Sequence, residues 1–172
     1  MPGVEVAHGG LQCPPPPVTL HSFLRHQPMS ITLTASYKDT LAAATVEKID
    51  ELLEENYFLD DMLEFIDERN ETNFVEYYEE YVRCGEAIGY EAVEALIDEN
   101  GECSCIVDCD ERYRGHYHDE AEFAEEFYTE TTDVPDGLVI DWQATYDSNL
   151  RYDFTSCNDG TSYRACHIFS DH

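Results

Sequence analysis

The chain has 172 residues, the length of one domain or of two small ones, and its charge is its most informative property. It holds 38 Asp and Glu against nine Lys and Arg, for a formal net charge of -29, while 42% of the residues are hydrophobic, with 12 Tyr and 8 Phe. Such a chain repels nucleic-acid phosphates and anionic membrane surfaces, and it is too rich in aromatic residues to be disordered. The composition excludes a nucleic-acid binder and indicates a folded protein with a basic partner or a cation.

We expect neither a transmembrane segment nor a secretory signal in this chain. No apolar run approaches the roughly 20 residues that span a bilayer, and the N-terminus has no basic region followed by a continuous apolar one. The seven cysteines are therefore expected to be reduced thiols, in a cytoplasmic protein.

The acidic residues are concentrated in the middle of the chain. Residues 47–102 carry 20 acidic side chains against three basic ones, and residues 103–136 carry 11 against two. A four-proline run, Pro14–Pro17, favours an extended segment near the start. We expect a disordered leader over 1–28, an acidic helical domain over 29–102 and a C-terminal α+β domain over 103–172.

Apolar residues recur at helical spacing from Val46 onwards. Val46, Ile49, Leu52 and Leu53 predict a first helix, for which Thr45 is the expected N-cap. A second helix follows from the spacing of four apolar residues, with acids on its opposite face: Leu59, Met62, Leu63 and Ile66.

Three further helices have recognisable ends. The pair Asn73-x-x-Glu76 is typical of a capping pair that opens a third helix, which Gly85 is expected to end. The fourth helix has apolar residues from Tyr90 to Ile97 and is expected to stop near Gly101. Asp119-x-x-Glu122 is the expected cap of a fifth helix.

The C-terminal part shows strand patterns. Residues 105–107 are expected to form a short strand. Apolar residues alternate over 150–154 and again over 163–169, and Asn158-Asp159-Gly160 lies between the two runs, which predicts a β-hairpin. The fold class expected from the whole pattern is α+β, with a helix-rich acidic middle region and a small C-terminal helix and sheet domain.

Cysteine and histidine residues gather between positions 103 and 118. Cys103, Cys105, Cys109, His116 and His118 have the side chains that bind zinc, but their spacing differs from the paired C-x2-4-C ligands of zinc fingers and ribbons. We therefore interpret them as buried cysteines and surface histidines and expect no metal or cofactor, while a metal-dependent protein remains a third interpretation of the sequence.

Neither a calcium loop nor a catalytic motif is present. A loop beginning at Asp108 and Asp110 would place Arg112 at its fifth position, Tyr113 at its sixth, where EF-hands have Gly, and Asp119 at its twelfth, where they have Glu. No nucleophile elbow, P-loop, dinucleotide-binding glycine pattern or H-E-x-x-H motif occurs. We expect no enzymatic activity.

The charge of -29 far exceeds the magnitude of roughly 2–8 that keeps a small domain soluble. B-DNA carries one charge per about 1.7 Å, so 29 charges correspond to roughly 14 base pairs, and a carboxylate can replace a phosphate oxygen as a partner of Arg or Lys. Ten acids lie mainly away from the apolar positions of their helices, with periodicity placing the last two less clearly than the others. These are the candidate partner-binding residues: Asp60, Asp61, Glu64, Asp67, Glu68, Glu76, Glu79, Glu80, Glu125 and Glu126.

Several blocks resemble the antirestriction family called ArdA. They are YRGHYHDEAEFAEEFY (113–128), VPDGLVIDWQAT (134–145), NLRYDFTS (149–156) and HIF (167–169), together with the acid-aromatic stretch 74–102. The resemblance covers roughly residues 57–169. It departs from the family in two places, because residues 29–56 are short and helical where the family has a β-containing first domain, and Tyr146-Asp147-Ser148 replaces a stretch that usually contains Arg.

The resemblance implies an elongated, acidic, dimeric DNA mimic from a phage or mobile element. Such proteins occupy the DNA-binding groove of type I restriction–modification enzymes in the bacterial cytoplasm and have no catalytic residues. We therefore expect a homodimeric inhibitor whose partner is the basic DNA-binding groove of a host restriction–modification enzyme. The alternative is an acidic inhibitor of another nucleic-acid enzyme, such as a polymerase, a nuclease or a CRISPR effector.

Overall fold

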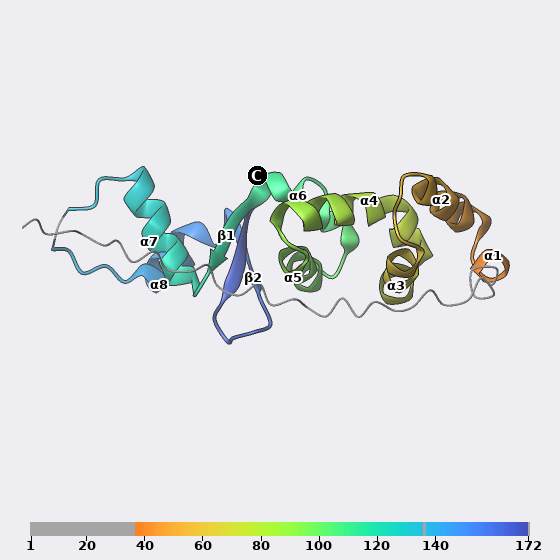
Figure 1. Ribbon diagram of the computed structural model, residues 1–172. Helices are drawn as coiled ribbons and strands as arrows, with labels where there is room; N and C mark the ends of the chain where they lie inside the picture. Colours follow the sequence, from red (N-terminus) through yellow and green to blue (C-terminus); the bar gives the residue numbers. More distant parts are fainter. Residues whose placement is uncertain (1–36, 136, 172) are drawn as a thin grey trace, which may run out of the picture.

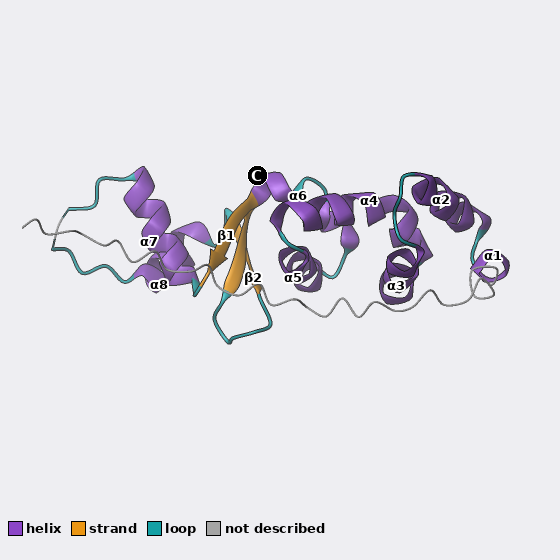
Figure 2. Ribbon diagram, in the orientation of Figure 1, coloured by secondary structure: helices purple, strands orange, loops and turns teal. Residues whose placement is uncertain are grey.

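The computed structural model describes residues 37–135 and 137–171 as an elongated molecule, with helices at both ends and a small sheet between them (Figures 1 and 2). The α+β class predicted from the sequence is confirmed. The leader expected over residues 1–28 lies outside the described residues.

The first and larger part is helical. Its elements are α1 (Tyr37–Thr40), α2 (Ala43–Glu54), α3 (Leu59–Arg69), α4 (Glu71–Ile88), α5 (Tyr90–Asn100), the 3-10 helix η1 (Cys103–Ile106) and the short α6 (Cys109–Arg112). The apolar faces of these helices form one core, which includes Ile49, Leu52, Phe74, Leu96 and Ile106, all at most 1% exposed.

Two predicted helix starts and one predicted end are wrong. Thr45 lies inside α2 and is only 1% exposed, and its hydroxyl donates to the Glu71 carboxylate over 2.6 Å, so it joins α2 to α4 rather than capping α2. The N-cap of α4 is Asn70, whose side chain accepts from the backbone N–H of Asn73 over 3.0 Å. Gly85 does not end α4, because the helix continues to Ile88.

Two other predicted helix ends are confirmed. Gly101 follows α5 in the left-handed conformation, with a φ of 75°, and its N–H donates to the carbonyl of Ile97. Asp119 caps α7 (Glu120–Thr131) by accepting from the N–H of Glu122, and the Glu122 carboxylate accepts in turn from the N–H of His118.

The sheet has three antiparallel strands, β1 (Tyr113–Tyr117), β2 (Phe154–Asn158) and β3 (Cys166–Ser170), in the order β1-β3-β2. The predicted hairpin is confirmed as β2 and β3. Both strands are shorter than expected, and Leu150 belongs to the π-helical turn η2 (Tyr146–Leu150) instead of to β2. The prediction of a strand over 105–107 is wrong, because Cys105 and Ile106 belong to the 3-10 helix η1. The sequence pattern did not predict β1.

The central strand β3 is buried along its whole length because helices cover both faces of the sheet. Phe169 packs into the core of the helical part, whereas Cys166 and Ile168 pack into a second core with Tyr117 and Phe123. This second core is completed by α7 and by η2, which follows the short helix α8 (Trp142–Thr145). The alternation of side chains along one strand thus joins the two cores.

Candidate functional site: the acidic helical surface and its groove

Helix α3 presents its acids to solvent because its other face is fixed in the core. Met62 is fully buried, and the ring of Phe65 lies 5.3 Å from that of Tyr78 and 5.0 Å from that of Tyr81, both on α4. Helical periodicity then turns the remaining positions outward. The five α3 acids of the predicted surface are all exposed: Asp60, Asp61, Glu64, Asp67 and Glu68.

The structure does not gather the ten predicted acids on one surface. Eight of them lie on α3 and α4, but Glu125 and Glu126 lie on α7, at the opposite end of the molecule beyond the sheet (Figure 1). Glu126 also accepts a hydrogen bond from the Tyr117 hydroxyl over 3.3 Å. Burial, reinforced by this carboxylate, raises the pKa of Tyr117 to about 12.

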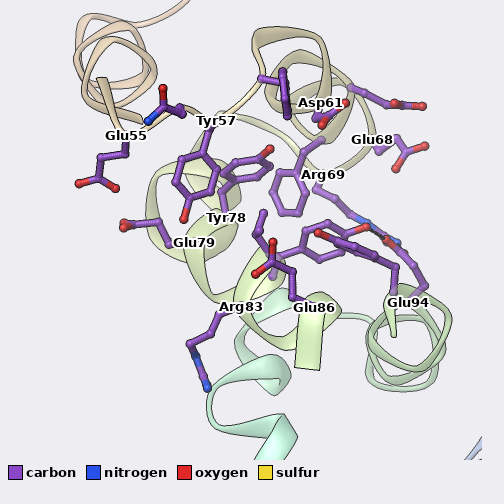
Figure 3. Close-up of a pocket in the computed structure, with 17 residues that line it drawn as sticks. Glu55, Tyr57, Asp61, Glu68, Arg69, Tyr78, Glu79, Arg83, Glu86 and Glu94 are labelled. Carbon is purple, nitrogen blue, oxygen red and sulfur yellow. Dashed lines mark hydrogen bonds and ion pairs between the residues drawn. The ribbon is translucent and has the colours of Figure 1, made fainter. Parts of the chain in front are cut away.

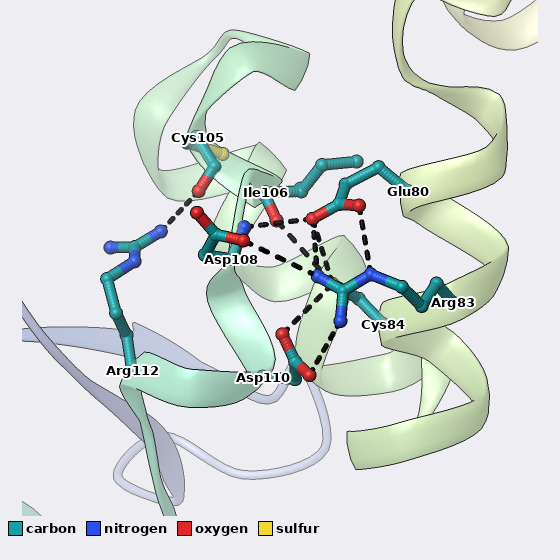
Figure 4. Close-up of polar contacts among 8 residues, drawn as sticks. All are labelled: Glu80, Arg83, Cys84, Cys105, Ile106, Asp108, Asp110 and Arg112. Atoms are coloured by element: carbon teal, nitrogen blue, oxygen red, sulfur yellow. Dashed lines mark hydrogen bonds and ion pairs between the residues drawn. The ribbon is translucent and has the colours of Figure 1, made fainter.

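Glu80 has a structural role that the sequence did not indicate. Its side chain is 23% exposed and receives two hydrogen bonds from the Arg83 guanidinium, at 3.0 and 2.6 Å, and one from the backbone N–H of Asp108 at 2.8 Å (Figure 4). Arg83 also donates to Asp110 over 2.8 Å. The network ties α4 to α6, and the hydrogen bonds from Arg83 lower the pKa values of both carboxyls.

Most of the other predicted acids have no cationic partner. Glu79 pairs with Lys48 on α2. Within residues 37–135 and 137–171, the remaining eight acids have no Lys, Arg or His nitrogen within 4 Å; these are Asp60, Asp61, Glu64, Asp67, Glu68, Glu76, Glu125 and Glu126. Their charges are therefore available to a partner.

A groove of about 1480 Å³ lies between α3, α4 and α5 (Figure 3). We call it the acid-aromatic groove, after the two kinds of side chain that line it. Its carboxylates are Glu55, Asp61, Glu64, Glu68, Glu79, Glu86 and Glu94, and its aromatic rings are Tyr57, Phe58, Phe65, Tyr78, Tyr81 and Tyr90. Four of the ten predicted acids thus belong to it, whereas its other acids and all of its rings were not among the predicted site residues.

One wall of the groove is fixed by the Glu94 carboxylate of α5. The Tyr81 hydroxyl donates to it over 2.6 Å, and the Arg69 guanidinium of α3 donates to its other oxygen. Arg69 also lies 3.7 Å from Asp98. These contacts connect three helices at the edge of the groove, and they leave the charge of Arg69 neutralised by its neighbours.

The groove also depends on the absence of a side chain at Gly85. A Cβ at this position would lie 2.3 Å from a ring carbon of Tyr90, so only glycine lets this ring rest against α4. The Tyr90 ring centroid then lies 5.3 Å from that of Tyr81. The helix-breaking role expected of Gly85 is therefore wrong: its conformational freedom is not used, whereas its small size is.

Negative charge accumulates at the mouth of the groove. Partial burial raises the pKa of Asp61 above its usual value, and the neighbouring carboxylates Glu64 and Asp60 raise it further. Since like charges disfavour the ionised form of Asp61, a cation placed here would relieve repulsion that the free protein bears.

The cysteines and histidines near position 110 are separated by the fold. Cys103 and Cys109 are buried in the helical core, and His116 on β1 pairs with Asp159 over 2.9 Å. Desolvation raises the pKa values of both thiols. In the part of the chain that the structure describes, no three His, Cys, Asp or Glu side chains are arranged to hold a metal ion.

No protein-family model, curated protein sequence or solved structure matches this chain. The described residues form an elongated molecule with unpaired carboxylates towards both ends and an acid-aromatic groove in its helical part. No helix within residues 37–135 and 137–171 combines the length and the apolar character needed to cross a membrane.

Proposed function

We propose that this protein is a non-enzymatic DNA mimic that occupies the DNA-binding groove of a type I restriction–modification enzyme and inhibits it, acting as a homodimer. The observation that carries the proposal is the row of five exposed α3 carboxylates, none of which has a cationic neighbour within the described residues. A net charge of -29 destabilises the compact state by self-repulsion, and a basic partner gives this charge a function.

Two further features support the same proposal. The molecule is elongated, as a substitute for a length of duplex should be (Figure 1). Residues 57–169 resemble the ArdA family in several blocks, in the right order. The carboxylates would replace phosphate oxygens as partners of the Arg and Lys side chains that line a DNA-binding groove.

The test is a titration of the protein against a fixed amount of a purified type I enzyme, with DNA binding and methylation both measured. A mimic should block both activities stoichiometrically, since a bound inhibitor acts once per site and no turnover is involved. Complete inhibition far below one dimer per site would contradict the proposal. Inhibition of a polymerase, a nuclease or a CRISPR effector, with the restriction enzyme unaffected, would favour the alternative partner class.

The salt dependence of association gives a second measurement. Complementary charge raises the association rate more than it raises affinity, and the Debye length falls from about 30 Å at 0.01 M salt to about 10 Å at 0.1 M. The association rate constant should therefore fall steeply over this range. A rate constant that does not change with salt would indicate an apolar interface in which the acidic surface takes no part.

A further inference from the structure

The acid-aromatic groove has a size and a lining that phosphate mimicry does not require. Its volume of about 1480 Å³ exceeds the roughly 300–1,000 Å³ of typical small-molecule sites. A segment of polypeptide, with several side chains, fits this volume better than a metabolite or a single ion.

Three of the aromatic rings in the groove are open or partly open to solvent. Phe58, immediately before α3, is 73% exposed, and Tyr90 is 43% exposed. Tyr57 is half-buried beside them, with its ring centroid 6.0 Å from that of the buried Tyr78. An exposed Phe contributes little to the protein's own core, and a surface that imitates phosphates gains nothing from it. These rings therefore suit a partner that brings apolar or planar groups.

The charge of the lining defines the complementary group. Its two arginines are already neutralised, Arg69 by Glu94 and Asp98 and Arg83 by Glu80 and Asp110, and Glu79 is paired with Lys48. The other five lining carboxylates have no Lys, Arg or His partner within the described ranges: Glu55, Asp61, Glu64, Glu68 and Glu86. The groove thus presents unpaired negative charge beside its aromatic rings.

We infer that the acid-aromatic groove docks an arginine-bearing peptide segment of a partner protein. A guanidinium is planar and weakly hydrated, stacks on aromatic faces and pairs with carboxylates through two parallel hydrogen bonds, whereas the ammonium of Lys is a strongly hydrated point charge. Rings beside free carboxylates therefore match arginine better than lysine, and Phe58 offers a contact to an apolar residue of the same segment. The inference does not depend on the DNA-mimic proposal, because any basic protein could supply such a segment.

The first experiment measures the affinity of the full-length protein for three synthetic peptides of about 12 residues by calorimetry. The first peptide carries Arg and Leu, the second replaces each Leu by Ser, and the third replaces each Arg by Lys. The Arg–Leu peptide should bind most tightly, by about fivefold or more over each of the others. Equal affinities for all three, or no binding at about 1 mM peptide, would overturn the inference.

The second experiment separates the groove from the overall charge of the protein. One variant removes four lining charges (Glu55→Gln, Glu64→Gln, Glu68→Gln, Glu86→Gln), and a control removes four exposed charges outside the groove (Asp67→Asn, Glu76→Gln, Glu125→Gln, Glu130→Gln). Both change the net charge equally. The groove variant should weaken binding of the Arg–Leu peptide about tenfold or more, and the control by no more than about threefold. Equal losses would mean that only the long-range field attracts the peptide.

The third experiment tests the aromatic contact with Phe58→Ala, matched by Tyr163→Ala. Tyr163 is 96% exposed and lies in the β2–β3 connection, away from the groove. Because both side chains are exposed, thermal melting of both variants should stay near that of the wild type. Phe58→Ala should weaken binding of the Arg–Leu peptide about fivefold. This loss of affinity should persist at about 0.3 M salt, because an apolar contact is not screened by ions. Equal peptide affinities of the two variants would show that Phe58 makes no contact with the peptide, and this result would refute the inference.

The outcomes keep this inference separate from the proposed function. A protein that inhibits the restriction enzyme stoichiometrically but binds none of the peptides refutes the groove inference and leaves the mimic intact. A protein that binds the Arg–Leu peptide through the groove but inhibits no restriction enzyme refutes the mimic and leaves the groove inference intact.

Discussion

Acidic side chains have different environments and roles in α3 and in the β2–β3 connection. On α3 the five acids are exposed and have no cationic partner within the described residues. In the β2–β3 connection, the side chain of Asp159 is only 7% exposed. It accepts hydrogen bonds from the Thr161 hydroxyl at 2.7 Å and from the backbone N–H groups of Thr161 and Ser162 at 2.8 and 3.2 Å, and it contacts His116 at 2.9 Å.

The abundance of Asp and Glu in this protein therefore does not correspond to a single role. An acid that receives several hydrogen bonds stabilises the fold, and removing it leaves donors unsatisfied. An exposed acid without partners contributes mainly repulsion to the free protein, so it can be removed with little loss of stability.

The largest effect is expected when the five α3 acids are converted together to amides: Asp60, Asp61, Glu64, Asp67 and Glu68. Each exposed charge pair contributes only about 0–1 kcal/mol, so the sum corresponds to a loss of affinity for the target enzyme on the order of a hundredfold. Melting should be unchanged or raised, because repulsion falls. Binding and thermal melting are the measurements, with the single variant Glu64→Gln as a nearly silent control.

Two outcomes would contradict the role assigned to the α3 acids. If binding and melting are both unchanged in the block variant, this face of α3 is not the mimic. If one substitution alone abolishes binding, the interface depends on a hot spot, and the account based on distributed charge fails.

The opposite result is expected for Asp159→Asn. An amide cannot accept at both of its terminal atoms, so the variant should lose about 2 kcal/mol of unfolding free energy while target binding stays the same. Denaturant unfolding measures the loss, and the exposed Asp133→Asn serves as the control. A fully stable Asp159→Asn protein would mean that these hydrogen bonds do not hold the connection.

The same residue predicts a pH dependence. Hydrogen bonds from Thr161, followed by the contact with His116, hold the pKa of Asp159 far below its usual value. Its stabilisation is therefore complete above the unfolded-state pKa of about 3.9 and is lost as the pH falls from there towards the folded-state pKa. The difference in stability between wild type and Asp159→Asn should shrink below about pH 4.

A smaller effect concerns Gly85 and Tyr90. In a helix interior, Ala is favoured over Gly by roughly 0.5–1 kcal/mol, but here its Cβ would displace the Tyr90 ring. Gly85→Ala should therefore be neutral or destabilising in the wild type, and stabilising by about 0.5–1 kcal/mol once Tyr90→Ala has removed the ring. A double-mutant cycle of unfolding free energies measures this coupling. Additive effects would show that the ring does not rest on Gly85.

The smallest effect concerns His167 on β3. Burial lowers its pKa, and the neighbouring His116 lowers it further, while Asp159 and Glu91 act in the opposite direction. The folded protein then binds fewer protons than the unfolded chain just below pH 6.5, so this residue reduces stability as the pH falls through that range. The unfolding free energy of the wild type should fall relative to His167→Gln between pH 7.5 and 5.5, by about 1 kcal/mol or less. A constant difference would contradict this sign.

Features that depend on neighbours along the chain could be predicted from the amino-acid sequence. The cap at Asp119 and the stop at Gly101 were predicted because each is made within one helical turn, by a side chain or a left-handed residue beside the groups it satisfies. The β2–β3 pairing was predicted because alternating residues flank a turn sequence. The outward position of the α3 acids follows from helical periodicity alone.

Features that depend on partners distant in the sequence became visible only in the folded molecule. Strand β1 contains a glycine and, among the described residues, pairs only with β3, about fifty residues later, so its own pattern is weak. Glu79 and Glu80 are adjacent and identical in type, yet one lines the groove and the other holds α6, because α6 packs on one side of α4. The acid-aromatic groove is formed by three helices and a connecting segment. No local sequence pattern predicts it, because its side chains come together only when these elements pack against one another.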